Sequence, residues 1–165
     1  LAIVYLHGFS ATRQEISPVS ENIARSLGAN LFQTRLTGHG RGSDAMSEAS
    51  VSDWANDALE AMTIARQLGD TVIVIGTSTG GTLATWLALQ TGDKRPDGLV
   101  LISPNFAPNN PNSKKLLWPW GLQLAEAILG KERSFTARAP KQELYWTTRY
   151  ATSALLPMMG LETGE

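Results

Sequence analysis

The sequence contains no cysteine among its 165 residues, so disulfide bonds, cysteine-ligated metal sites and a thiol nucleophile are excluded. Its apolar runs are of strand length, well short of the roughly 20 residues that a transmembrane helix needs. Histidine is also scarce, since only His7 and His39 are present and both lie in the first quarter of the chain. A reaction that needs a histidine base must therefore use one of these two or a residue outside this sequence.

The sequence also lacks an excess of charge of either sign. Fourteen basic and 15 acidic residues give a net charge of −1, which provides no electrostatic basis for binding nucleic acid or an anionic membrane. No basic region precedes a signal-like apolar core, which favours a cytoplasmic location. A hydrophobic content of 42% and a charged content of 18% are typical of a globular domain.

The start of the chain is unusual for a globular domain. Residue Leu1 is not methionine, and residues 1–6 form a continuous apolar run typical of a strand that is covered on both faces. Domains seldom begin inside a core strand. We therefore expect further residues to precede Leu1 in the natural protein.

Strands and helices alternate in the pattern of the first 103 residues. Ser50 and Asp53 form a capping-box pattern for a long helix that ends near Leu68, and Ser17 is expected to cap an earlier helix that stops at Gly28. This alternation predicts an α/β fold with a mostly parallel, doubly wound sheet. The predicted strands are residues 1–6, 31–36, 71–75 and 98–102, and the predicted helices are 18–27, 50–68 and 79–90.

The pattern changes at Pro104. Residues 104–111 are rich in proline and asparagine and predict a loop, and helices are expected over residues 116–129 and 143–156. No strand is expected after Ile102. We therefore predict two parts: an α/β core over residues 1–103 and a helical segment over residues 104–165.

A G-x-S-x-G pentapeptide, residues 76–80, lies between the third predicted strand and the following helix. A tight strand-to-helix turn lifts a serine side chain above the end of a sheet, and this is the context that a nucleophile elbow requires. Gly76 and Gly80 allow neighbouring backbone to crowd Ser78, where a Cβ would clash. The pattern therefore indicates that Ser78 is a nucleophile.

Three motifs at the ends of successive predicted strands together resemble the α/β-hydrolase family. These motifs are residues 7–9 (HGF), 38–43 (GHGRGS) and 76–80 (GTSTG). The sequence is most similar to the branch of carboxylesterases, monoacylglycerol lipases and related serine hydrolases that carry a helical lid. The resemblance implies a sheet of the α/β-hydrolase type, truncated in this chain, with residues 104–165 as the lid.

The resemblance also implies roles for individual residues. Ser78 would attack an acyl carbonyl, and the backbone N–H groups of Phe9 and Thr79 would form the oxyanion hole. The implied substrate is a small-molecule ester with an apolar acyl or alkyl group, with no metal or organic cofactor. The family places its acid and histidine after later strands, which this chain lacks, so no triad acid or base is assigned here.

Several alternatives remain open. His39 could serve as a base, whereas His7 is expected to anchor its loop by hydrogen bonds. The chain could be a noncatalytic binding module, or a second chain or missing sequence could complete its sheet. Peptidase, thioesterase, acyltransferase and carbon–carbon hydrolase activities share the same elbow. The remaining acidic candidates, Asp44, Asp53, Asp93 and Asp97, are expected to be loop, cap or surface carboxylates.

Overall fold

The computed structural model describes residues 1–107 and 115–163 of the chain. Within them a parallel sheet has the strand order β2-β1-β3-β4. Strand β1 is buried along its whole length, as expected for a strand covered on both faces. The predicted α/β architecture is therefore confirmed. The strands are β1 (Ala2–Leu6), β2 (Asn30–Gln33), β3 (Val72–Thr77) and β4 (Gly98–Ile102).

Strand β2 is shorter than the predicted strand over residues 31–36. Beyond Gln33, the backbone N–H of Thr34 still reaches the carbonyl of Tyr5, but the N–H of Leu36 donates to the imidazole of His7 instead. A side chain thus replaces the neighbouring strand as acceptor, and the chain leaves the sheet at this point.

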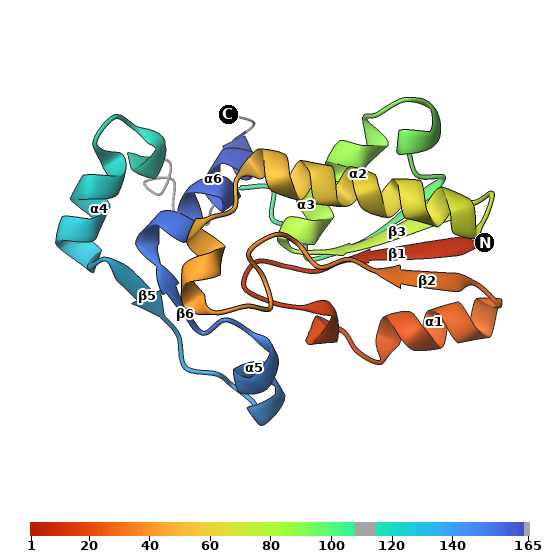
Figure 1. Cartoon of the computed structure of the whole chain (residues 1–165), viewed down its shortest axis with the longest axis horizontal. Helices are drawn as coiled ribbons and strands as arrows, with labels where there is room; N and C mark the ends of the chain where they lie inside the picture. The colour runs from red at the N-terminus through yellow and green to blue at the C-terminus, as the bar shows by residue number, and fades with distance from the viewer. Residues whose placement is uncertain (108–114, 164–165) are drawn as a thin grey trace.

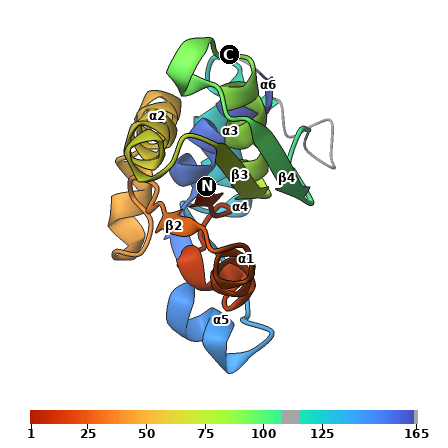
Figure 2. The ribbon, with the colours of Figure 1, turned by 90° about the vertical axis from the view of Figure 1, so that its right-hand side faces the viewer.

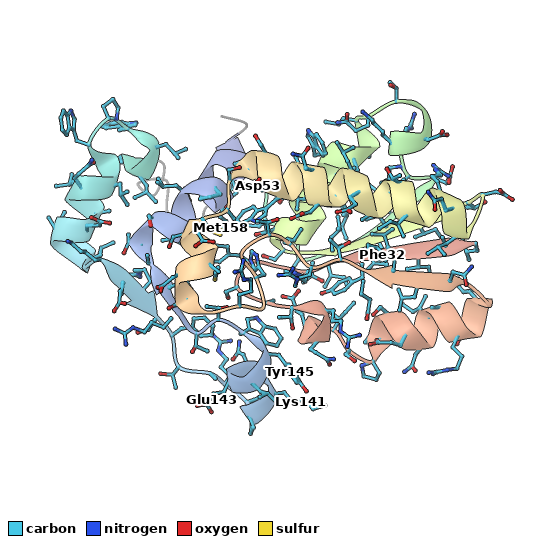
Figure 3. The ribbon with its side chains drawn as sticks, in the orientation of Figure 1. Phe32, Asp53, Lys141, Glu143, Tyr145 and Met158 are labelled. Carbon is cyan, nitrogen blue, oxygen red and sulfur yellow. The ribbon has the colours of Figure 1, made fainter. Side chains whose placement is uncertain are left out.

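Helices cover both faces of the sheet (Figures 1 and 2). Helix α1 (Val19–Leu27) packs on one face, over a cluster that includes Ile3 and Tyr5. Helices α2 (Val51–Leu68) and α3 (Thr79–Ala88) pack on the other face, where Phe32 of β2, labelled in Figure 3, also joins the apolar cluster. The candidate site lies at the carboxyl ends of the strands, which these helices do not cover.

The caps of α1 and α2 differ from each other. Ser50 and Asp53 form the predicted capping box of α2, which ends at Leu68 as expected. For α1 the prediction was wrong, because the N-cap residue is Pro18 and no side chain caps the helix. The Ser17 hydroxyl instead donates to Glu21, so it does not accept a backbone N–H.

The segment after residue 114 contains strands as well as helices. Strands β5 and β6 pair in an antiparallel sheet, so the prediction of no strand after Ile102 was wrong. The helix predicted over residues 143–156 is replaced by the end of α5, strand β6 and the start of α6. The elements are α4 (Gly121–Leu129), β5 (Glu132–Ser134), α5 (Pro140–Tyr145), β6 (Arg149–Ala151) and α6 (Leu155–Thr163).

Pairing between distant residues explains this hairpin. Arg149 on β6 forms an ion pair with Glu132 on β5, and the N–H of Phe135 donates to the carbonyl of Thr148. The helix predicted over residues 116–129 begins only at Gly121, where an added Cβ would lie 2.2 Å from the carbonyl oxygen of Lys115. The contacts within the hairpin join residues far apart in sequence, so a local pattern does not reveal them.

Short 3₁₀ helices connect several of these elements. Of the predicted loop over residues 104–111, residues 104–107 lie in no helix or strand and the rest falls outside the described residues. No helix among the described residues is both long and apolar enough to span a bilayer. The 3₁₀ helices are η1 (Arg13–Glu15), η2 (Ser43–Ser47), η3 (Gly92–Lys94) and η5 (Thr152–Ala154).

Candidate active site

Ser78 lies in a tight turn between β3 and α3, which confirms the predicted strand–turn–helix context. Its backbone has φ 51° and ψ −118°, a conformation that L-residues rarely adopt and that costs free energy unless the surroundings enforce it. A Cβ on Gly80 would lie 2.1 Å from the carbonyl oxygen of Leu6, and a Cβ on Gly76 would lie 2.4 Å from that of Gly80. Both flanking glycines are therefore required by close backbone packing.

Hydrogen bonds hold this nucleophile elbow (residues 76–80) against the residues that follow β4. The N–H of Ser78 donates to the carbonyl of Ile102 at 3.0 Å. The Ser78 carbonyl accepts from Gly81 at 2.8 Å and from Asn105 at 3.1 Å. The side-chain amide of Asn105 in turn donates to Glu162 on α6. Both the N–H and the carbonyl of Ser78 in the strained turn are thus held by hydrogen bonds.

The segment over residues 7–11, called the oxyanion loop after the role that the sequence predicts for Phe9, follows β1 and lies directly beside the elbow. A Cβ on Gly8 would lie 3.1 Å from the Cβ of Ser78. The Gly8 carbonyl is hydrogen-bonded to His7 Nδ1 at 2.9 Å and to the N–H of Ala11 at 3.2 Å. In a trans peptide the next N–H points opposite to the carbonyl, so the N–H of Phe9 faces away from these partners.

Two backbone N–H groups next to Ser78 are therefore unengaged. Within the described residues, neither the N–H of Phe9 nor that of Thr79 has a hydrogen-bond acceptor. Thr79 is also the first residue of α3, where the helix dipole favours negative charge. The structure thus places all three predicted residues, Ser78, Phe9 and Thr79, at the carboxyl end of the sheet.

His7 anchors the oxyanion loop, as predicted. Its Nε2 lies 3.1 Å from the N–H of Leu36 and accepts that proton, so Nδ1 carries the ring proton and donates to the Gly8 carbonyl. Burial is the main cause that lowers the pKa of His7 to about 3. The ring is neutral and both of its nitrogens are engaged, which makes it unsuitable as a base for Ser78.

His39 packs behind the oxyanion loop. Its ring centroid lies 5.0 Å from that of His7, 5.9 Å from Phe9 and 5.5 Å from Trp54, and its Nδ1 is 3.1 Å from the Thr37 carbonyl. Burial lowers its pKa. No hydrogen bond joins it to Ser78 within the described residues, so the structure gives His39 a packing role.

A partly buried polar network, which the sequence patterns do not predict, lies beneath the loop. Glu15 Oε2 accepts from the N–H of Gly8 and from the hydroxyl of Tyr5, both at 2.8 Å. The Tyr5 oxygen also lies 3.2 Å from Thr77 Oγ1, in the residue before Ser78. Burial raises the pKa of Glu15, although both hydrogen bonds act in the opposite direction. A single acidic residue in a polar loop carries no sequence signal for this position.

The segment after residue 114 contacts the oxyanion loop directly. The ring of Tyr150 on β6 packs edge-on against Phe9, with centroids 5.2 Å apart. The N–H of Thr147 donates to the carbonyl of Ser10 at 2.7 Å. The loop that carries a candidate oxyanion donor is thus held between the sheet and the later segment.

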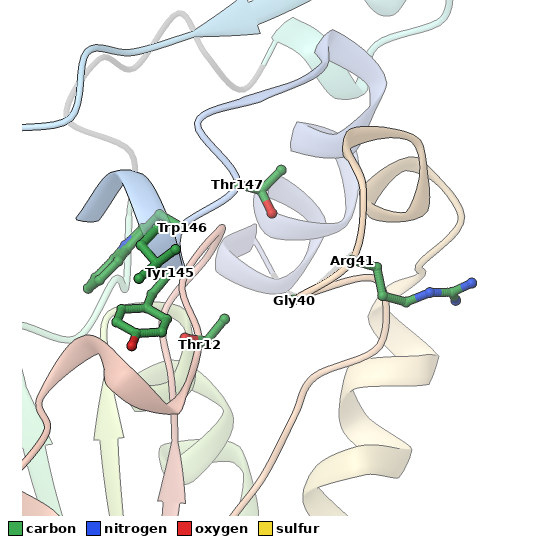
Figure 4. A pocket seen from close by; sticks show the side chains of 7 residues that line it. Thr12, Gly40, Arg41, Tyr145, Trp146 and Thr147 are labelled. Atoms are coloured by element: carbon green, nitrogen blue, oxygen red, sulfur yellow. The ribbon is translucent and has the colours of Figure 1, made fainter. Parts of the chain in front are cut away.

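A pocket of about 260 Å³ lies beside this contact, between the loops of the core and α5 (Figure 4). The Arg41 side chain points away from the rings of Tyr145 and Trp146 in that view. Lys141 and Glu143 lie with Tyr145 on α5, at the lower end of the view in Figure 3. None of the three candidate site residues lines this pocket, which is lined by Thr12, Gly40, Arg41, Leu144, Tyr145, Trp146 and Thr147.

The acidic residues with assigned contacts have structural roles. Asp53 accepts hydrogen bonds from the backbone N–H and hydroxyl of Ser50. Asp97 pairs with Arg66 at 2.7 Å and accepts the N–H of Val72. These two carboxylates behave as predicted, as a cap and a surface group. Among the described residues no cluster of three or more His, Cys, Asp or Glu could hold a metal ion.

Comparisons with known proteins find similar sequences and similar folds. A family model described as serine aminopeptidase, S33, a hydrolase family, matches residues 1–153. A thermostable monoacylglycerol lipase from Bacillus sp. (strain H-257) is 30% identical over 111 residues, 67% of this chain. A structure of the metagenome-derived lipolytic enzymes LipS and LipT has a TM-score of 0.79 at 23% identity over 98% of this chain. An α/β-hydrolase from Penicillium sp. sh18 has a TM-score of 0.66 at 13% identity over 97% of it.

The chain is shorter than these proteins. It spans 42% of the curated lipase and 63% of each of the two solved structures. Because both structures are less than 25% identical to it, their likeness concerns the fold, which is that of the α/β-hydrolases.

Proposed function

The chain belongs to the serine aminopeptidase S33 family of α/β-hydrolases, and from this we propose that it is part of a serine hydrolase that cleaves carboxylic esters. The observation that carries the proposal is the position of Ser78. It occupies a strained elbow beside the unengaged N–H groups of Phe9 and Thr79. An ester carbonyl above Ser78 would meet a nucleophile and two hydrogen-bond donors together.

The reaction would proceed in two steps. Ser78 Oγ would attack the acyl carbonyl and transfer its proton to a base, and the tetrahedral oxyanion would accept hydrogen bonds from Phe9 and Thr79. Collapse of this intermediate would release the alcohol and leave an acyl group on Ser78. Water would then attack the acyl-enzyme, releasing the carboxylic acid and restoring the serine.

The described residues offer no group that could act as the base for Ser78. His7 is engaged at both ring nitrogens, and His39 is packed among aromatic rings. We therefore assign the triad histidine and acid to sequence outside this chain. The chain spans 42% of the lipase relative, so a longer natural protein has room for them.

We assign an apolar acyl or alkyl group to the substrate. The segment after residue 114 exposes large apolar side chains, including Trp118 and Trp120, which are 63% and 78% exposed. The similarity to a monoacylglycerol lipase supports the same class. In this proposal residues 104–165 form the lid that sets the acyl preference.

Labelling with a fluorophosphonate, followed by mass spectrometry, tests the proposal on the chain as given and on a longer natural form. Adduct confined to Ser78, absent from Ser78→Ala and retained in a matched Ser47→Ala control, is the expected result. Equal labelling of Ser78→Ala would contradict an acyl-enzyme at this residue. Hydrolysis of a medium-chain nitrophenyl ester then tests the substrate class.

A noncatalytic binding module is the second candidate. The observation in its favour is that both histidines have structural contacts within the described residues. Absence of labelling in both folded forms would favour this alternative.

Completion of the sheet by a second chain or by further sequence is a separate question. Strand β4 is at the edge of the sheet among the described residues, and Val100 and Leu101 on it are 44% and 38% exposed. Exposed apolar edge strands promote association. We propose that other polypeptide covers this edge. A monodisperse monomer of the chain as given, with no copurifying protein, would argue against a separate partner chain.

A further inference from the structure

Glu15 occupies a position that the reaction outlined above does not use. It ends η1, and its carboxylate reaches back beneath the oxyanion loop to accept the N–H of Gly8 at 2.8 Å. A Cβ on Gly8 would lie 2.8 Å from Glu15 Oε1 and 3.1 Å from the Cβ of Ser78. The carboxylate and the candidate nucleophile therefore flank the same side of Gly8.

A second hydrogen bond connects Glu15 to the elbow. Tyr5 is fully buried in β1 and its hydroxyl donates to Glu15 Oε2. A phenol has one proton, so when Tyr5 donates to an ionised Glu15 the Thr77 hydroxyl can donate to Tyr5. Thr77 directly precedes Ser78. One carboxylate oxygen thus connects the loop that carries Phe9 to the turn that carries Ser78 and Thr79.

We propose that Glu15 is a positioning residue that fixes the oxyanion loop relative to the nucleophile elbow, so that the N–H groups of Phe9 and Thr79 converge on one oxygen. Charge-assisted hydrogen bonds are roughly twice as strong as neutral ones, which suits a carboxylate to this role. The inference rests on the proposed function, because an oxyanion hole has a purpose only in a catalyst.

The energetics of burial support a functional role. Burial raises the pKa of Glu15 in the folded chain above its value in the unfolded chain, in spite of its two hydrogen bonds. An acid with a raised pKa stabilises the fold at low pH, and this contribution is lost as pH rises through the folded pKa. The ionised form of Glu15 is therefore less favourable to the fold than the protonated form, as expected of a group kept for function.

The titratable groups around Glu15 are few. Tyr5 on β1 is in direct contact, and Glu21 on α1 acts on Tyr5 electrostatically. Glu21 accepts from the hydroxyls of Ser17 and Ser20, away from the oxyanion loop. Glu21→Gln is therefore a matched control that removes a neighbouring carboxylate without touching the loop.

Nuclear magnetic resonance of the chain as given tests the contact without requiring activity. We expect the Gly8 amide proton signal to shift with pH as Glu15 titrates, and this shift to vanish in Glu15→Gln but persist in Glu21→Gln. Hydrogen exchange at Gly8 should be faster in Glu15→Ala, because the hydrogen bond that protects this amide is lost. A Gly8 signal that is equally pH-dependent in Glu15→Gln would overturn the proposal.

Stability and reactivity together separate positioning from a merely structural role. At pH 8 we expect Glu15→Gln to be at least as stable as the wild type. We expect its Ser78 labelling in the longer natural form to be about 10-fold slower, less than the ~10²–10³-fold loss for removing an oxyanion donor. A less stable variant labelled at the wild-type rate would contradict the proposal. If no variant is labelled, the proposed function fails, and the amide signals still decide whether Glu15 holds the loop.

Discussion

The core up to residue 107 and the segment over residues 115–163 differ in how they bury apolar side chains. In the core, strand β1 is buried at every position and α2 buries five residues along one face. In the later segment, α4 and α5, which the structure describes in full, bury none. Of the buried hydrophobic residues described, only Ala154 and Met159 belong to this segment.

The two regions therefore meet different requirements of the candidate site. The elbow and the oxyanion loop need positions accurate to a fraction of an ångström, and dense backbone packing around Gly76 and Gly80 provides this. The later segment contacts the loop through Tyr150 and Thr147, and several of its large apolar side chains, including Trp118 and Trp120, are exposed. The geometry of the candidate site is therefore a property of the core, and we expect substitutions there to cost the most stability.

The largest difference in lost stability is expected between substitutions of two tryptophans. Trp54 is fully buried and donates to the Thr37 carbonyl at 3.0 Å, whereas Trp120 is 78% exposed. Trp54→Ala should lower the free energy of unfolding by about 3–5 kcal/mol, and Trp120→Ala by no more than about 0.5 kcal/mol. Urea unfolding followed by far-UV circular dichroism measures both. A loss above about 1.5 kcal/mol for Trp120→Ala would show that other parts of the protein cover α4.

A glycine pair tests how tightly the elbow is packed. A Cβ on Gly80 meets backbone atoms of Leu6 and His7, whereas one on Gly42 meets nothing within 4 Å. Gly80→Ala should therefore cost about 3 kcal/mol, at the upper end of the overpacking range, and Gly42→Ala should be close to neutral. Equal unfolding midpoints for the two variants would refute the close packing of the turn.

Acid should destabilise the core, because it holds both histidines. Burial lowers the pKa of His7 from 6.5 to about 3 and also lowers that of His39. Below pH 6.5 the unfolded chain takes up protons that the fold excludes, so stability falls as pH decreases. His7 alone should cost about 2 kcal/mol at pH 5, a slope of ~1.4 kcal/mol per pH unit. Equilibrium unfolding at pH 7.5, 6 and 5 measures this slope, which should decrease in His7→Gln; an unchanged slope would contradict the assignment.

The smallest expected effect lies where the two regions meet. Tyr150 packs edge-on against Phe9, and such aromatic pairs contribute about 0.5–1.5 kcal/mol. Tyr150→Ala should thus cost about 1 kcal/mol and speed hydrogen exchange at the Ala11 amide, which is bonded to the Gly8 carbonyl in the same loop. Tyr145→Ala, whose ring makes no contact with Phe9 in the described structure, serves as the control. If both variants leave exchange at Ala11 unchanged, the later segment does not restrain the oxyanion loop.

The sequence was informative where local patterns and packing agree. The continuous apolar runs predicted β1, β3 and β4, because parallel strands are covered on both faces. The capping box at Ser50 located the start of α2, and the glycine spacing around Ser78 located the elbow. These features depend on contacts between residues that are close in sequence or on burial of a whole strand.

The sequence was uninformative where distant residues supply the interaction. Strands β5 and β6 have three residues each and form through pairs such as Glu132 with Arg149, so no periodic pattern marks them. The Ser17 cap failed because its hydroxyl bonds Glu21 instead. Glu15 was overlooked because its partners, Tyr5 and Gly8, approach it only once η1 folds back under the loop.

The sequence by itself determined the alternation of strands and helices, the family motifs and the position of Ser78 in a strand–turn–helix, because glycine placement and apolar runs act over a few residues. Only the tertiary structure decided which backbone N–H groups of the elbow and loop have no acceptor among the described residues, that both ring nitrogens of His7 are engaged, and that His39 Nδ1 lies at the Thr37 carbonyl. It also brought Glu15 beneath Gly8. Hydrogen-bond partners and burial depend on the whole folded chain, since they require surfaces distant in sequence to meet.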